Sequence, residues 1–240
     1  MTFENIVGKI SSILAAVVIY SIAGGFYLSQ KGFVWEDGDF ILVRGAYAAE
    51  RPSPSVNDLV RPAPFSVTPH HYLGASDAPV TLYEFSSLGC THCADFHLDL
   101  LPKLKKDYVD TGKLRIVFVD FPIDQRSMKA SMLARCVSKD KYFDFLGLLF
   151  KKQNSWGYSP KAERILSGYA EMEGLSAEEA KKCMADDKVA EEIIYNRQQA
   201  LEKLKIQGTP SFLIRGSGEE EVIHGVPSYS RLQEIIGRHL

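Results

Sequence analysis

The sequence has almost no excess of charge of either sign: 28 lysine and arginine residues face 30 aspartate and glutamate residues, for a formal net charge of −2. A chain that binds nucleic acid through its phosphates carries a clear excess of positive charge. The balance therefore gives no electrostatic reason to expect a nucleic-acid partner. The 240 residues, 45% of them hydrophobic, suffice for one core of ordinary globular size with an appended element.

Cysteine and histidine are scarce, with four and six residues in the whole chain. A structural zinc site needs four ligands, and only Cys90, His92 and Cys93 lie close together in the sequence. We therefore expect no resident metal and no other cofactor. With so few cysteines, their placement carries the information rather than their number.

Charged residues are absent from residues 10–30, and the centre of this run is strongly apolar. At about 1.5 Å per residue, a helix of this length just crosses a bilayer core of roughly 30 Å. The run fits a signal-anchor that stays in the membrane or a signal peptide cleaved after Ser21-Ile22-Ala23. Its apolar continuation past this triplet favours the anchor. Both interpretations export the rest of the chain. A buried soluble helix is a further alternative, which the lack of a polar face disfavours.

Residues 31–70 are rich in proline, which prevents a regular helix or a central strand, so the segment is predicted to be a semi-extended tether. Its apolar part, residues 33–43, fits a short strand, a membrane-surface contact or a self-association element, and the sequence does not choose among them. The prolines are Pro52, Pro54, Pro62, Pro64 and Pro69.

Two cysteines stand where a buried strand gives way to a helix. The apolar residues 80–83 predict the strand, and the amphipathic pattern from Phe96 onward predicts the helix. Cysteines three positions apart on a first helical turn share one face and are close enough to bridge. Cys90 lies nearer the free N–H groups and the positive end of the helix dipole, which stabilise a thiolate. We expect Cys90 to be a nucleophile and Cys93 to be its resolving partner.

Neighbouring side chains are expected to tune this pair. A Cys-x-x-Cys at a helix start can lower the thiol pKa to roughly 3.5–7.5. A protonated His92 would favour the Cys90 thiolate, which stabilises the reduced form and makes the disulfide a stronger oxidant. Glu84, six positions before Cys90 on the buried strand, is a candidate to carry protons for Cys93 during exchange.

The other two cysteines, Cys136 and Cys183, fall in a long region of helical pattern. If they pair, they form a structural disulfide that the chain-entropy model values at roughly 4 kcal/mol. Such a bond requires an oxidising compartment, which agrees with export. Two free thiols and a redox relay are the alternatives.

Thr209-Pro210 follows a glycine and opens the apolar strand 211–214, so its X-Pro bond is a candidate cis peptide. Taken alone, Thr-Pro is only a loop signal. Its position after the helical region strengthens the prediction of a cis peptide.

Together, four groups of residues resemble the DsbA family of bacterial thiol-disulfide oxidoreductases. They are Gly74-Ala75-Ser76-Asp77-Ala78-Pro79-Val80-Thr81, Glu84-Phe85, Cys90-Thr91-His92-Cys93 and Gly208-Thr209-Pro210-Ser211-Phe212. The resemblance covers about residues 71–240.

The resemblance implies an α/β thioredoxin fold with an inserted all-helical domain. It also implies that the cis-proline loop packs opposite the Cys-x-x-Cys pair, where the backbone of Thr209 would bind an incoming substrate as an added strand. The expected organisation is a signal segment (1–30), a tether (31–70), a first thioredoxin half (71–125), a helical insert (126–205) and a second thioredoxin half (206–240).

The function implied is a periplasmic oxidase that forms disulfides in reduced or misoxidised exported proteins, recycled by a quinone-linked membrane thiol oxidase. Thr91 stands where the best-known oxidases have proline, and isomerase-like relatives also have threonine at the position of Thr209. A disulfide reductase or isomerase, recycled by a membrane reductase, therefore remains an alternative. Alternatives of other classes are a copper-binding thioredoxin-fold module and a scaffold without catalysis.

Overall fold

The computed structural model describes residues 33–36, 39–42, 65, 67 and 71–240, and the chain divides into two compact units, residues 1–61 and 62–240. In the first unit, strands β1 (Phe33–Glu36) and β2 (Asp39–Leu42) pair antiparallel. Of the three interpretations of segment 33–43, the structure thus supports the strand. The predicted signal or anchor segment, residues 10–30, lies outside the described residues. Among the helices of the described residues, none is both long and apolar enough to span a bilayer.

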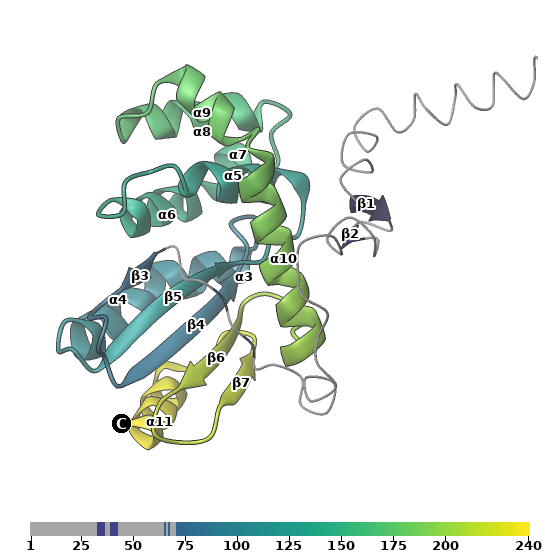
Figure 1. Ribbon diagram of the computed structural model, residues 1–240. Coiled ribbons are helices and arrows are strands. Elements are labelled where there is room, and N and C mark those ends of the chain that lie inside the picture. The colour runs from purple at the N-terminus through teal and green to yellow at the C-terminus, as the bar shows by residue number, and fades with distance from the viewer. Residues whose placement is uncertain (1–32, 37–38, 43–64, 66, 68–70) are drawn as a thin grey trace, which may run out of the picture. The chain divides into compact units, whose positions relative to one another are not determined.

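The second unit is built on a mixed five-stranded sheet with strand order β3-β5-β4-β6-β7 (Figure 1). Only the β4–β5 pair is parallel within this sheet, and the other three neighbouring pairs are antiparallel. The strands are β3 (Tyr72–Leu73), β4 (Val80–Ser86), β5 (Leu114–Asp120), β6 (Ser211–Arg215) and β7 (Glu221–His224).

The connection from β4 to β5 is one continuous helical run in four parts. These are α3 (Thr91–Asp95), the π-helical turn η1 (Phe96–Leu100), α4 (Leu101–Leu104) and a second π-helical turn η2 (Lys105–Val109). Pro102 lies in the first turn of α4, directly after η1. Proline has no N–H to donate to the preceding turn, and a π-helical turn is a common way to accommodate that loss.

The insert is helical, as its sequence pattern predicts. Its helices are α5 (Gln125–Ala134), α6 (Tyr142–Lys151), α7 (Gln153–Trp156), α8 (Ala162–Met172), α9 (Ala177–Cys183) and the long α10 (Asp187–Leu204). A capping box is present at the start of α9, with Ser176 and Glu179 each bonding the other's backbone. Asp124 and Asp186 cap α5 and α10 in the same region.

Two apolar layers cover the sheet. On one face, side chains of β4, β5 and β6 pack against the α3–η2 run and the C-terminal helix α11 (Tyr229–His239). On the opposite face they pack against α10, and Phe65 joins this layer through edge contacts with Tyr83 and Phe85. The sheet is therefore enclosed, which explains why β4 reads as a nearly continuous apolar run.

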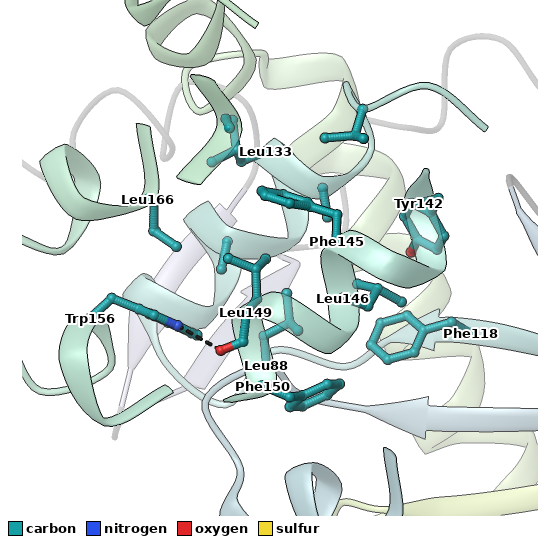
Figure 2. Packing of buried hydrophobic residues seen from close by; sticks show 14 of the residues in the cluster. Leu88, Phe118, Leu133, Tyr142, Phe145, Leu146, Leu149, Phe150, Trp156 and Leu166 are labelled. Carbon is teal, nitrogen blue, oxygen red and sulfur yellow. Dashed lines mark hydrogen bonds between the residues drawn. The ribbon is translucent and has the colours of Figure 1, made fainter. Parts of the chain in front are cut away.

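A third apolar cluster lies within the insert (Figure 2). It contains Trp156, Phe145 and Leu149 from the helices, and Leu88 from the segment that follows β4. Leu88 is fully buried in this cluster, so the insert holds the chain at the point where β4 gives way to α3.

Candidate active site

Cys90 and Cys93 lie at the predicted junction of strand and helix. Ser86 ends β4, Cys90 is the N-cap residue of α3 with extended backbone angles, and Cys93 lies within the first turn. The backbone N–H of Cys90 bonds to the carbonyl oxygen of Ser87 at 3.0 Å, which closes the turn between the two elements. Cys90 is half-buried, Cys93 is fully buried, and both sulfurs are free thiols.

The two cysteines have opposite acidities. A hydrogen bond from the Cys93 side chain is the largest cause that lowers the pKa of Cys90 from about 9 to about 5. The side chain of Thr209 and the backbone N–H groups of Cys93 and His92 lower it further. Burial raises the pKa of Cys93 far above its ordinary value. Near neutral pH the reduced pair therefore holds a thiolate at Cys90 and a proton at Cys93.

Thr209 and Pro210 come to this pair from the other half of the fold. Their peptide bond is cis. The carbonyl oxygen of Thr209 accepts a hydrogen bond from Cys90 Sγ at 3.4 Å. A shallow pocket of about 390 Å³ extends along this loop, and its lining includes Lys205, Pro210 and His224.

Glu84 lies fully buried on β4, paired with Phe118 of β5 and Phe212 of β6. Burial raises the pKa of its carboxyl from 4.5 to about 8, so Glu84 is largely protonated at neutral pH. Ser86, two residues along the same face of β4, lies near both Glu84 and Cys93 and lowers both of their pKa values. The strand thus places a protonated carboxyl one serine away from the buried cysteine.

His92 and Thr91, the two residues between the cysteines, both point to solvent. The His92 side chain is 75% exposed, and its Nδ1 lies 3.4 Å from the carboxylate of Asp95. Stabilisation of the thiolate by a protonated imidazole stays a prediction, whereas the backbone N–H of His92 is one of the groups that lower the pKa of Cys90. The physical reason is its place in the first helical turn, where the N–H points back to the N-cap and the side chain points outward. Thr91 is the exposed first residue of α3.

Cys136 and Cys183 are joined by a disulfide with a Cα–Cα distance of 6.2 Å. The bond connects the segment after α5 to the last residue of α9. Cys136 is exposed and Cys183 half-buried, so the bond lies at the surface of the insert.

Two buried polar contacts near the site were not predicted. Gln153 of α7 donates hydrogen bonds from Nε2 to the carbonyl oxygens of Leu88 and Cys90. Asp120, at the end of β5, pairs with the buried guanidinium of Arg135 at 2.8 Å. In a single sequence, nothing distinguishes a lone glutamine, or an aspartate and an arginine from different elements, from residues at the surface.

The described residues contain no group of three or more His, Cys, Asp or Glu side chains that could hold a metal ion. What the geometry does supply is a half-exposed thiolate, a buried thiol that can form a disulfide with it, and a protonated carboxyl on the preceding strand. This arrangement suits thiol-disulfide exchange.

A mixed sheet enclosed by helices, a Cys-x-x-Cys at the start of the helix after the central strand and a cis-proline beside it define a thioredoxin-fold protein with a dithiol site. Residues 66–238 match the family described as Thioredoxin, and the chain belongs to this family. The α/β thioredoxin fold expected from the sequence is thereby confirmed.

Relatives and solved structures indicate which members of this family the chain is similar to. The chain is 35% identical over 145 residues to a putative protein-disulfide oxidoreductase of Rickettsia bellii, covering 60% of this chain and 56% of that protein. It is 27% identical over 188 residues to disulfide bond formation protein D of Bacillus subtilis, covering 77% of this chain and 82% of that protein. The chain spans about half the length of the curated Rickettsia relatives it matches.

Among solved structures, alpha-DsbA1 of Wolbachia pipientis matches with a TM-score of 0.65 and 31% identity, covering 70% of this chain and 89% of that chain. With the oxidoreductase relatives, this match identifies the chain as a member of the DsbA family of thiol-disulfide oxidoreductases. The resemblance noted in the sequence is confirmed.

Proposed function

We propose that the protein is an exported protein-disulfide oxidase that donates the Cys90–Cys93 disulfide to reduced substrate proteins. The observation that carries the proposal is the opposite acidity of the pair, with the pKa of Cys90 near 5 and the pKa of Cys93 raised by burial. A stabilised thiolate favours the reduced form of the pair, and this makes the disulfide form oxidising.

The reaction takes place in two exchanges. A substrate thiolate attacks the Cys90 sulfur of the Cys90–Cys93 disulfide, an S–S bond forms between substrate and Cys90, and Cys93 leaves and takes a proton. A second substrate thiolate then attacks the substrate sulfur of this mixed disulfide, and Cys90 leaves as a thiolate. The substrate loses two electrons and gains a disulfide, and the enzyme pair gains the two electrons. Cys90 is the better leaving group because its thiolate is the more stable one.

Glu84 is proposed to exchange the proton that Cys93 gains and loses. Its carboxyl is protonated near neutral pH, and the hydroxyl of Ser86 lies beside both groups. A buried thiolate at Cys93 is strongly disfavoured, so its leaving requires a proton at that moment. Thr91 and His92 form the exposed rim of the site, which an approaching substrate meets first.

Substrate binding is proposed at the cis-proline loop. The backbone of Thr209 faces Cys90 and offers its polar groups to an extended substrate segment, which would join as an added strand along Pro210. The proposed substrates are reduced or misoxidised exported proteins in the periplasm. A quinone-linked membrane thiol oxidase would remove the two electrons, and residues 10–30 would tether the protein to the inner membrane.

The reverse direction, reduction or isomerisation with a membrane reductase as partner, would use the same pair. The reduction potential of Cys90–Cys93, equilibrated with glutathione, decides between them. An oxidase should lie near the strongly oxidising end of the known range, about −120 mV, and a value near the roughly −270 mV of a reductant would refute the proposal. A second assay follows oxidation of a reduced, disulfide-requiring protein, and Cys90→Ser should abolish this activity.

A further inference from the structure

A buried amide from the helical insert holds the backbone of the active-site segment. Gln153 lies at the start of α7 and is only 4% exposed. Its Nε2 donates to the carbonyl oxygen of Leu88 at 2.7 Å and to that of Cys90 at 3.0 Å. One side chain thus spans the turn between β4 and α3.

The same segment is held by packing on either side of this amide. Leu88 lies in the apolar cluster of the insert beside Leu149 and Phe150 (Figure 2). A Cβ built on Gly89 would lie 3.2 Å from Cβ of Ser127, so the start of α5 also approaches closely. Residues 88–90 have little room to shift while these contacts persist.

The carbonyl oxygen of Cys90 links the amide of Gln153 to the reactive cysteine. It accepts the first hydrogen bond of the helix, from the backbone N–H of Ala94 at 3.2 Å, as well as the amide of Gln153. The orientation of this peptide group fixes the direction of the next N–H groups, those of His92 and Cys93, which act on the Cys90 sulfur.

We propose that Gln153 is a positioning residue for Cys90, which keeps the first turn of α3 aimed so that its N–H groups stabilise the Cys90 thiolate. This inference deepens the proposed oxidase function and rests on it for its role in catalysis. The physical part, the coupling of a buried amide in the insert to the acidity of Cys90, stands independently of which substrate the enzyme oxidises.

The test compares two substitutions within α7. Gln153→Met keeps length and volume but removes the donor. Trp156→Phe is the matched control, because it removes another buried donor from the same cluster, the Nε1–H that bonds to the carbonyl of Leu149 at 2.9 Å. That bond touches no residue of the active-site segment.

The readouts are the pKa of Cys90, from the ultraviolet absorbance of its thiolate, and the melting temperature. In Gln153→Met the pKa of Cys90 should rise by about one unit, because the backbone N–H groups that stabilise its thiolate are no longer held in direction. The equilibrium constant with glutathione should shift up to about tenfold toward the disulfide. Trp156→Phe should lower the melting temperature and leave the pKa unchanged.

An unchanged pKa in a folded Gln153→Met, or an equal shift in Trp156→Phe, would overturn the inference and reduce Gln153 to a structural residue. Should Gln153→Met not fold, Gln153→Asn replaces it, because the shorter amide keeps a donor but cannot reach both carbonyls; the same rise in pKa is then required. A wild-type enzyme that oxidises no protein, while Gln153→Met still raises the pKa, would reject the proposed function and keep this inference.

Discussion

In the thiol form of Cys90, its sulfur donates a hydrogen bond to the carbonyl oxygen of Thr209 at 3.4 Å, across 119 positions of the chain. The contact joins the two halves of the thioredoxin fold, which the helical insert separates in the sequence. Under the proposed function, a substrate segment would meet the backbone of Thr209 as it approaches the Cys90 sulfur.

The pH dependence of Cys90 alkylation follows from its pKa of about 5. The thiolate is the reactive form, so the rate constant should be flat above about pH 6 and fall about tenfold per pH unit below pH 5. In Cys93→Ala the hydrogen bond from Cys93 is lost, and the midpoint should rise by at least about one unit. A wild-type midpoint near that of an ordinary cysteine would contradict the structure.

The hydroxyl of Thr209 contributes separately to this acidity. Thr209→Val keeps the shape of the side chain and removes the hydroxyl, so the pKa of Cys90 should rise by about half a unit. Thr111→Val is the control, since it removes an exposed hydroxyl that bonds only to backbone carbonyls of η2. If both variants shift the pKa alike, the effect does not come from the contact with Cys90.

Replacement of Glu84 by glutamine should stabilise the protein at neutral pH. The pKa is about 8 when folded and 4.5 when unfolded, so between these values the folded state holds a proton that the unfolded state has released. The free energy of unfolding then falls by about 1.4 kcal/mol per pH unit as pH rises through this window. Glu84→Gln removes this pH-dependent loss. Its free energy of unfolding should therefore exceed that of the wild type by up to about 3 kcal/mol at pH 7 and equal it at pH 4.

Urea unfolding at several pH values measures this difference, with Glu219→Gln, at an exposed position, as the control. The same substitution should slow the release of Cys93 as the mixed disulfide between substrate and Cys90 forms, if Glu84 supplies its proton. A variant that is stabilised but fully active would separate the two roles and remove Glu84 from catalysis.

Local patterns were enough to predict most of the site. The apolar run before Cys90 and the amphipathic run after Cys93 place the pair at a strand-to-helix junction. The hydrogen bond from Cys93 lowers the pKa of Cys90 most, and the backbone N–H groups at the start of the helix lower it further. The helices of the insert follow from periodicity, and strand β6 follows from the apolar run 211–214. In each case the information lies within a few residues of the feature.

What the sequence could not supply depends on tertiary contacts. Strand β3 has only two residues, too few for a periodic signal, and exists because it pairs with β5. The bonds of Gln153 and the Asp120–Arg135 pair join residues from different elements. The direction of the His92 side chain is likewise set by the helix geometry rather than by its place between two cysteines.

The reduced protein should be more stable than the oxidised one. The pKa of Cys90 is about 5 when folded against about 9 for an ordinary thiol, so the stabilisation is complete above pH 9 and is lost as pH falls through 5. The melting temperature at pH 7 should be a few degrees higher with Cys90 and Cys93 reduced, and this difference should vanish near pH 5. Calorimetry of both forms measures it, and a more stable oxidised form at pH 7 would contradict an oxidase.

The Cys136–Cys183 disulfide should stabilise the insert without touching the redox site. It closes a loop of 47 positions, for which chain entropy gives at most about 4 kcal/mol, and its surface location means that little packing is lost in Cys136→Ala/Cys183→Ala. Urea unfolding should show a loss of about 2–4 kcal/mol. The single variant Cys136→Ala should lose as much, since one cysteine cannot form the bond.

The turnover of the double variant distinguishes a purely structural bond from a redox relay. A structural bond leaves the alkylation profile and the oxidation of substrate proteins unchanged at a temperature where the variant is folded. A relay requires electrons to pass between the pairs, so its loss would slow turnover while binding and folding stay intact. Unchanged turnover with lowered stability is the expected result, because each cysteine of this bond is fixed on the insert and the opposing acidities that drive exchange are already complete within Cys90 and Cys93.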